Sequence, residues 1–173
     1  NVDYGYDHKT RQEMDYYLGW YWQANDDVAL DLGYLKYSYP KESQFNQSDV
    51  YAILHAYGFE LAAYYGDDYP TYFGEKQSNL YTYLAYNAEL PAEFQLRVRY
   101  GRNDAKDPLY LSGGEDTRDT YHEWEVKLSH ELVGLDWAVS YIDTDLSRYE
   151  CLNNFGFKDA CTATVVASVA KSF

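Results

Sequence analysis

Few side chains in this sequence of 173 residues offer recognisable catalytic chemistry. Ser129, His130 and Glu131 superficially supply a nucleophile, a base and an orienting acid. The surrounding pattern is that of a β-strand, on which adjacent side chains point to opposite faces, so the Ser129 and His130 side chains cannot hydrogen-bond to each other. A triad assembled from distant strands is the alternative, although no nucleophile elbow supports it. We therefore expect no enzyme, no catalytic residues and no cofactor.

The two cysteines, Cys151 and Cys161, lie close together near the C-terminal end of the sequence. In an exported protein two cysteines in one exposed loop usually pair, and closing so short a loop stabilises a fold by about 2–3 kcal/mol. Metal binding is the alternative, but neither His122 nor His130 has a sequence relation to the pair. We expect a disulfide between Cys151 and Cys161 and no metal site.

Acidic residues outnumber basic ones, 28 against 14, and give a formal net charge of -14. This balance excludes nucleic acid as a partner, because its phosphates would repel the chain. Many of the acids cluster in polar segments: Asp26-Asp27, Asp67-Asp68, Asp104 to Asp107, Glu115-Asp116 and Asp143-Thr144-Asp145. Such carboxylates can hold Ca²⁺, but none has the spacing of a twelve-residue calcium loop, and solvated loops are the favoured interpretation.

The elements that carry these residues are predicted by an alternation of apolar and polar side chains. Between Phe94 and Tyr100, for example, Leu96 and Val98 share a face with both end residues. Period-two alternation is typical of β-strands, which Tyr, Val, Thr and Trp also favour. We expect nine strands, at residues 13–24, 28–39, 48–58, 59–66, 78–88, 94–102, 118–130, 135–145 and 160–173. Residues 1–7 are predicted to be the end of a tenth strand.

The expected strands and their connections have the proportions of a membrane barrel. Most strands run to about 9–13 residues, longer than the usual soluble strand of about 5–6 and suited to crossing a bilayer at a tilt. Short turns alternate with longer polar links, at 8–12, 40–47, 67–77, 103–117 and 146–159. This asymmetry is typical of outer-membrane barrels. A soluble β-sandwich with aromatic cores is the alternative.

Aromatic residues on the apolar faces are predicted to form two belts at the membrane interfaces, where Tyr and Trp bury a ring and keep a polar tip wet. The expected belt residues are Tyr16, Trp20, Trp22, Phe59, Tyr65, Phe94, Tyr100, Trp124, Trp137, Tyr141 and Phe173. Polar residues expected in the lumen alternate with these apolar ones along each strand. The average over both faces is therefore negative, with a mean hydropathy of -0.61 in a chain with 22 tyrosines.

The polar faces are predicted to line the lumen of this barrel. Their residues are Asp31, Glu60, Gln95, Arg97, Arg99, Glu123, Glu125 and Lys127. Glu123 and Glu125 are expected to pair with Arg97, Arg99 or Lys127. Two interpretations stay open: a conduction path, and a salt-bridge network that fills and braces a narrow lumen. The apolar stretch Pro108–Leu111 either folds inward as a constriction, docks a partner or packs over the rim.

The last strand ends in Phe173 and resembles the assembly signal of bacterial outer-membrane proteins. The segments Asn1–Tyr4, Leu32–Pro40, Tyr141–Leu146 and Val169–Phe173 resemble the TorF-like porin family of proteobacterial outer-membrane proteins. The resemblance implies a porin-like barrel with no catalytic or binding set. It also implies two further strands before residue 1, and hence about twelve strands in the intact protein.

The sequence therefore predicts an all-β fold, an antiparallel up-and-down transmembrane β-barrel in a single domain over residues 1–173, of which about ten strands are visible. The expected function is passive passage of small hydrophilic solutes across the bacterial outer membrane. The alternative is a non-conducting barrel with a structural or partner-binding role in a larger envelope complex. The expected partners are outer-membrane lipid, lipopolysaccharide and, through the strand ending at Phe173, the barrel-assembly machinery.

Overall fold

One large antiparallel sheet makes up most of the fold in the computed structural model, which describes residues 9, 12–71, 75–113 and 116–171. In chain order the elements are β1 (Met14–Asn25), β2 (Val28–Ser38), η1 (Ser43–Phe45), β3 (Gln47–Ala56), β4 (Phe59–Pro70), β5 (Lys76–Glu89), η2 (Pro91–Glu93), β6 (Gln95–Ala105), β7 (Tyr110–Gly113), β8 (Asp116–Arg118), β9 (Thr120–Leu132), β10 (Leu135–Thr144), α1 (Arg148–Phe155) and β11 (Thr164–Ala170). The all-β prediction is confirmed.

Nine strands pair in the order β1-β2-β3-β4-β5-β6-β9-β10-β11, and β7 and β8 form a separate hairpin. Each of the nine segments expected from the alternation overlaps one strand of the sheet, although several strands extend beyond the predicted bounds. The links differ from the prediction because several of them contain regular structure. The expected loop 40–47 contains η1, and the expected loop 67–77 contains the end of β4 and the start of β5. The expected loop 103–117 contains the end of β6, the strand β7 and the start of β8, and the expected loop 146–159 contains the helix α1. Residues 1–7 lie outside the described part of the chain.

Two of the short turns owe their tightness to left-handed backbone. Tyr57 and Gly58 join β3 to β4 with φ of 53° and 84°, and Val133 and Gly134 join β9 to β10 with φ of 56° and 70°. Positive φ at both central residues matches the right-handed twist of the flanking strands, and glycine adopts it without steric cost. These turns hold each hairpin in a fixed register, so each strand keeps its apolar and polar faces.

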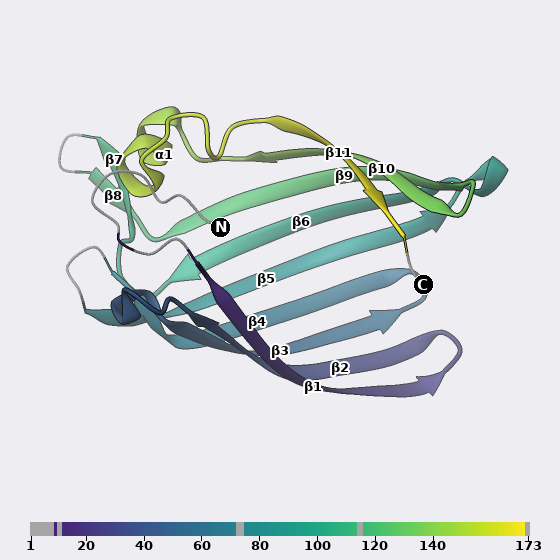
Figure 1. The fold of residues 1–173 in the computed structure, drawn as a ribbon, viewed down its shortest axis with the longest axis horizontal. Helices are drawn as coiled ribbons and strands as arrows, with labels where there is room; N and C mark the ends of the chain where they lie inside the picture. The colour runs from purple at the N-terminus through teal and green to yellow at the C-terminus, as the bar shows by residue number, and fades with distance from the viewer. Residues whose placement is uncertain (1–8, 10–11, 72–74, 114–115, 172–173) are drawn as a thin grey trace.

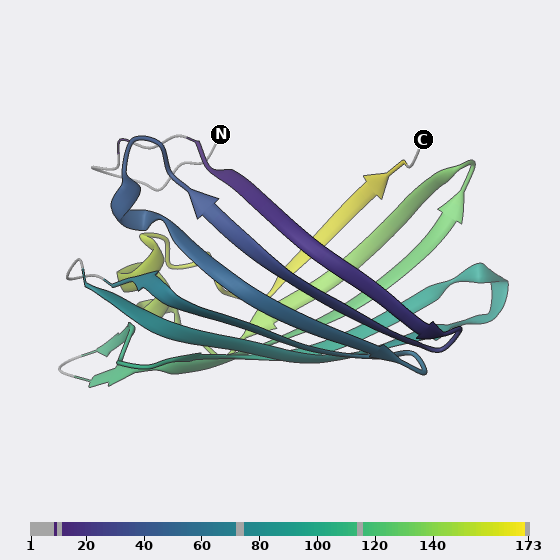
Figure 2. The same ribbon diagram turned by 90° about the horizontal axis from the view of Figure 1, so that it is seen from below.

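The sheet is curled into an open trough (Figures 1 and 2), with β1 and β11 along its two rims. The short turns lie at one end of the trough, and α1, β7 and β8 lie at the other (Figure 1). Among the described residues, β1 pairs only with β2 and β11 only with β10, so each presents one unpaired edge and the sheet does not close on itself.

Candidate functional site

The two faces of the sheet differ in chemistry and in burial. Along β4, Phe59 and Leu61 are 51% and 54% exposed, whereas Glu60 and Ala62 are 8% and 1% exposed. Because the sheet is a single curved layer, its concave face crowds side chains together while its convex face leaves them open. The polar set therefore lies on the concave face, and the exposed apolar set lies on the convex face.

The predicted belt aromatics lie on the convex face wherever the structure describes them. The strand register places nine of them there, and stacking on His130 places Phe94 beside them: Tyr16, Trp20, Trp22, Phe59, Tyr65, Phe94, Tyr100, Trp124, Trp137 and Tyr141. Aliphatic residues such as Leu18, Val98 and Val139 lie between them and are also exposed. Phe173 lies outside the described residues.

Glu60 is the centre of one ion-paired group on the concave face. Arg97 donates to both of its carboxylate oxygens, from Nη2 at 2.7 Å and from Nη1 at 3.1 Å. The hydroxyl of Tyr83 donates to Oε1 at 2.5 Å, and Nδ1 of His55 lies 3.5 Å from Oε2. A carboxylate with this many donors is well compensated for its loss of water.

Arg99 is the centre of a second group, one step along the same strand. Its Nη2 lies 3.2 Å from Glu123 Oε1 and 3.5 Å from Glu125 Oε2, and the Tyr81 hydroxyl also donates to Glu123. The expected pairing of Glu123 and Glu125 with a lumen arginine thus occurs through Arg99. Arg97 instead reaches across β5 to β4 and binds a carboxylate that the sequence did not pair with it.

Stacked tyrosines, which the sequence pattern alone does not single out as site residues, join these groups. The rings of Tyr51 and Tyr64 stack with centroids 5.3 Å apart, and those of Tyr64 and Tyr83 stack at 6.4 Å. The guanidinium carbons of Arg97 and Arg99 lie 6.0 Å and 5.6 Å from the centroid of the Tyr83 ring. The signal in the sequence is that all these tyrosines occupy the polar phase of the alternation.

A glycine on β2 makes room for this aromatic cluster. A Cβ placed on Gly33 would lie 2.4 Å from Cζ of Tyr51, so no other residue fits there unless the ring moves. The Tyr51 hydroxyl donates to Oδ1 of Asp31 at 3.4 Å, which places this predicted lumen residue on the concave face as well. Close contact between an aromatic ring and a strand glycine fixes the ring against the wall.

The remaining predicted lumen residues, Gln95 and Lys127, lie at the end of the trough that carries the short turns. Together with Arg97, Asn87 and Ser129 they line a cavity of about 450 Å³. Among the described residues, Lys127 has no carboxylate within ion-pair distance. This cation therefore remains available to water or to a solute.

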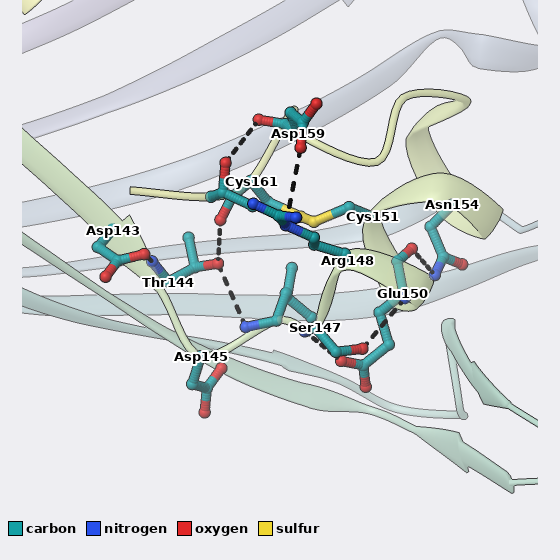
Figure 3. The surroundings of a disulfide bond; sticks show 12 residues. Asp143, Thr144, Asp145, Ser147, Arg148, Glu150, Cys151, Asn154, Asp159 and Cys161 are labelled. Atoms are coloured by element: carbon teal, nitrogen blue, oxygen red, sulfur yellow. Dashed lines mark hydrogen bonds and ion pairs between the residues drawn. A yellow bond between two sulfur atoms is a disulfide. The ribbon is translucent and has the colours of Figure 1, made fainter. Parts of the chain in front are cut away.

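A small cap formed by α1, β7 and β8 lies at the opposite end of the trough (Figure 1). Cys151 and Cys161 form a disulfide with Cα atoms 5.9 Å apart, which confirms the predicted pair (Figure 3). Cys151 is fully buried, in a cluster with Tyr110 and Leu146. Tyr110 also packs edge-on against Tyr121 at 5.3 Å, so the predicted apolar stretch 108–111 packs over the concave face.

The helix of the cap has clear local determinants. Ser147 accepts a hydrogen bond from the backbone of Glu150, and the Glu150 carboxylate accepts one from the backbone of Ser147, which together form a capping box (Figure 3). Gly156 ends the helix with φ of 78°. Eight residues are too few for a clear helical period, so the sequence pattern predicts a loop over this stretch.

Arg118 on β8 ties the cap to the sheet through Asp145, which follows β10, and ties β8 to α1 within the cap through Glu150. Its Nη2 lies 3.0 Å from Asp145 Oδ2, and its Nη1 lies 3.6 Å from Glu150 Oε1. Burial raises the pKa of Asp145, but hydrogen bonds from His122 and Arg118 outweigh this effect and leave the pKa below its usual value. The pKa of Glu150 is lowered in the same way, as hydrogen bonds from Ser112 and Ser147 outweigh burial. Both groups are therefore ionised at neutral pH.

The described residues form neither the Ser129–His130 pair of a catalytic triad nor a metal-ligand cluster. His130 stacks on the Phe94 ring at 4.6 Å on the convex face, while Ser129 lines the concave cavity, so these neighbours point apart. Within the described ranges, no three His, Cys, Asp or Glu residues gather as metal ligands. No helix in the described part of the chain is long and apolar enough to cross a membrane.

Comparison with known families assigns the whole chain. Residues 1–173 match the model of a family described as bacterial protein of unknown function (Gcw_chp). The chain is a member of this Gcw_chp family. No curated protein and no solved structure matches it.

Proposed function

We propose that this Gcw_chp protein is a β-barrel of the bacterial outer membrane that forms a narrow pore for small hydrophilic solutes. The observation that carries the proposal is the contrast between the faces of one sheet, with exposed apolar side chains outside and ion-paired side chains inside. Water as the only solvent would favour the reverse arrangement, because soluble monomers rarely expose apolar patches larger than a few hundred Å².

A membrane around the sheet would account for the exposed apolar side chains of the convex face. Hydrocarbon would solvate Leu61, Val98 and Val139, and the two interfaces would take the aromatic residues at either end of the convex face. A soluble sandwich would need a second sheet against the convex face, and the only other sheet among the described residues is the hairpin of β7 and β8. The resemblance to TorF-like porins agrees with the membrane alternative.

Closure of the barrel requires strands that pair with the free edges of β1 and β11. Unpaired backbone groups cannot remain in hydrocarbon, because each costs several kcal/mol there. We infer that further strands bridge these two edges, to give about twelve strands in the closed barrel. The assembly machinery would recognise the C-terminal strand β11, and acidic loops would bind lipopolysaccharide through divalent ions.

The second candidate is a non-conducting barrel with a structural or partner-binding role. It is favoured by one specific observation, which is that Glu60, Glu123 and Glu125 already share the donors of Arg97 and Arg99. Stacked tyrosines fill the space beside them. A barrel of about twelve strands is far narrower than the open porins of 16–18, so such a layer could close it.

Single-channel recording of the full-length protein in planar bilayers separates the two candidates. Discrete conductance steps whose size changes in Arg97→Glu would support a pore, because that substitution breaks the ion pair with Glu60 and reverses a charge in the lumen. Protease protection of the strands in vesicles shows whether the protein is folded and inserted. Absence of conductance from such protein would favour the non-conducting barrel. Protein that stays soluble and monomeric in the presence of vesicles would contradict both.

A further inference from the structure

We infer that the pore selects cations, with Asp31 as a residue that determines this preference. The inference rests on the proposed pore and names the class of solute that it passes. At the strand positions that lie opposite a residue of a neighbouring strand, the concave face carries nine carboxylates. The same positions carry only three permanent cations, Arg97, Arg99 and Lys127.

Two of the three cations are already occupied by carboxylates. Arg97 is bound at both nitrogens by Glu60, which leaves that pair electrically neutral. Arg99 is shared between Glu123 and Glu125, so this group carries a net charge of about -1. An anion that entered the lumen would find neither guanidinium free to receive it.

Asp31 adds a second negative charge on the opposite wall. It accepts a hydrogen bond from the neutral hydroxyl of Tyr51 at 3.4 Å, and no cation of the described residues lies within ion-pair distance of it. Four strands separate β2, which carries Asp31, from β9, which carries Glu123 and Glu125. Figure 2 shows β2 and β9 on different sides of the trough, so a solute between the walls has negative charge on both sides.

The two ends of the concave face reinforce the same sign. Glu89, Glu131 and Asp136 lie there at the short-turn end, and Asp15 lies at the long-link end. Lys127 is the one permanent cation at the paired concave positions of the described strands that lacks a carboxylate partner. Rings of carboxylates in a low-dielectric pore raise the local concentration of cations and exclude anions.

The test is the reversal potential of the full-length protein in planar bilayers under a KCl gradient. The wild-type permeability ratio of K⁺ to Cl⁻ should exceed one. Asp31→Asn should lower that ratio by about two- to fivefold, as expected for loss of one screened charge in a narrow pore. Lys127→Gln should raise it, because the substitution removes the one unpaired cation. Asp26→Asn, in the turn between β1 and β2, is the matched control and should leave the ratio within experimental error.

Each outcome bears on a different claim. A conducting pore that prefers Cl⁻, or a ratio unchanged in both Asp31→Asn and Lys127→Gln, would overturn the cation inference and leave the pore intact. Absence of conductance from correctly inserted protein would overturn the pore and the cation inference together. Circular dichroism of each variant shows whether the strands are retained.

Discussion

The convex and concave faces are built from alternate residues of the same strands, yet they are stabilised in opposite ways. The convex face has apolar contacts between neighbouring strands, such as that of the Phe59 and Tyr86 rings at 4.7 Å. The concave face has charged contacts that reach across a strand, such as the bidentate contact of Arg97 with Glu60. Apolar character is enough for the contacts of the convex face, whereas the charged groups of the concave face depend on specific partners.

This difference predicts how each face responds to substitution. A charged residue of the Glu60 or Arg99 group is one member of a pair, so its loss leaves a charged group without compensation. An apolar residue of the convex face has few specific partners, so we expect other apolar side chains to be tolerated there. Only a charged side chain should lower the free energy of unfolding substantially. The following variants test this contrast in order of expected effect.

Arg97→Ala should have the largest effect on stability. It leaves the Glu60 carboxylate, which is 8% exposed, without its guanidinium, and breaking such a pair typically costs about 3–5 kcal/mol. The free energy of unfolding from vesicles in urea, followed by tryptophan fluorescence, measures it. Arg102→Ala is the matched control, since its pair with Asp104 is exposed and worth at most about 1 kcal/mol. Equal losses in both variants would contradict the contrast.

Val98→Arg tests the convex face at the neighbouring position of the same strand. A charge facing the middle of a bilayer should lower the free energy of unfolding by about 2–4 kcal/mol. Leu132→Arg, at the end of β9, should cost only about 0–1 kcal/mol, because an arginine near the interface reaches water. If both substitutions are neutral in vesicles, the convex face does not meet hydrocarbon.

Replacing both cysteines by alanine should loosen the cap, which has no counterpart on the convex face. Closing a short loop by a disulfide stabilises a fold by about 2–3 kcal/mol. The helix α1 should then exchange its amide hydrogens faster, while β4 and β5 keep their protection. Loss of protection along the whole sheet would show that the cap and the trough unfold as one unit.

The contrast between the faces could be predicted from sequence because it depends only on alternation. Phe94, Leu96 and Val98 alternate with Gln95 and Arg97 whatever the final register. The strands and the short turns follow from the same pattern, together with glycine at positions 58 and 134.

The partners on the concave face could not be predicted, because they depend on curvature and on reach across strands. Arg97 lies opposite Lys127 on one side and Asn87 on the other, so pairing alone does not suggest Glu60, which lies two strands away. The contacts of Tyr83 could not be predicted either. An aromatic residue at a polar position of the alternation gives no indication of which side chains its ring and hydroxyl will contact. Ser147, Glu150 and Gly156 are residues that favour the start and end of a helix at α1, but the helix is too short to show a helical period in the sequence.

Tyr83→Phe gives the smallest of these effects and the sharpest comparison. It removes the hydroxyl that donates to Glu60 while Arg97 still compensates the charge, so the cost should be about 0.5–1.5 kcal/mol. Tyr86→Phe, on the convex face of the same strand, should change the free energy of unfolding by less than this, because its ring contact with Phe59 is kept. Combining Tyr83→Phe with Arg97→Ala should give a non-additive loss, since both substitutions act on one carboxylate. Additive losses would mean that Tyr83 and Arg97 stabilise the trough independently and that the Glu60 group is not a unit.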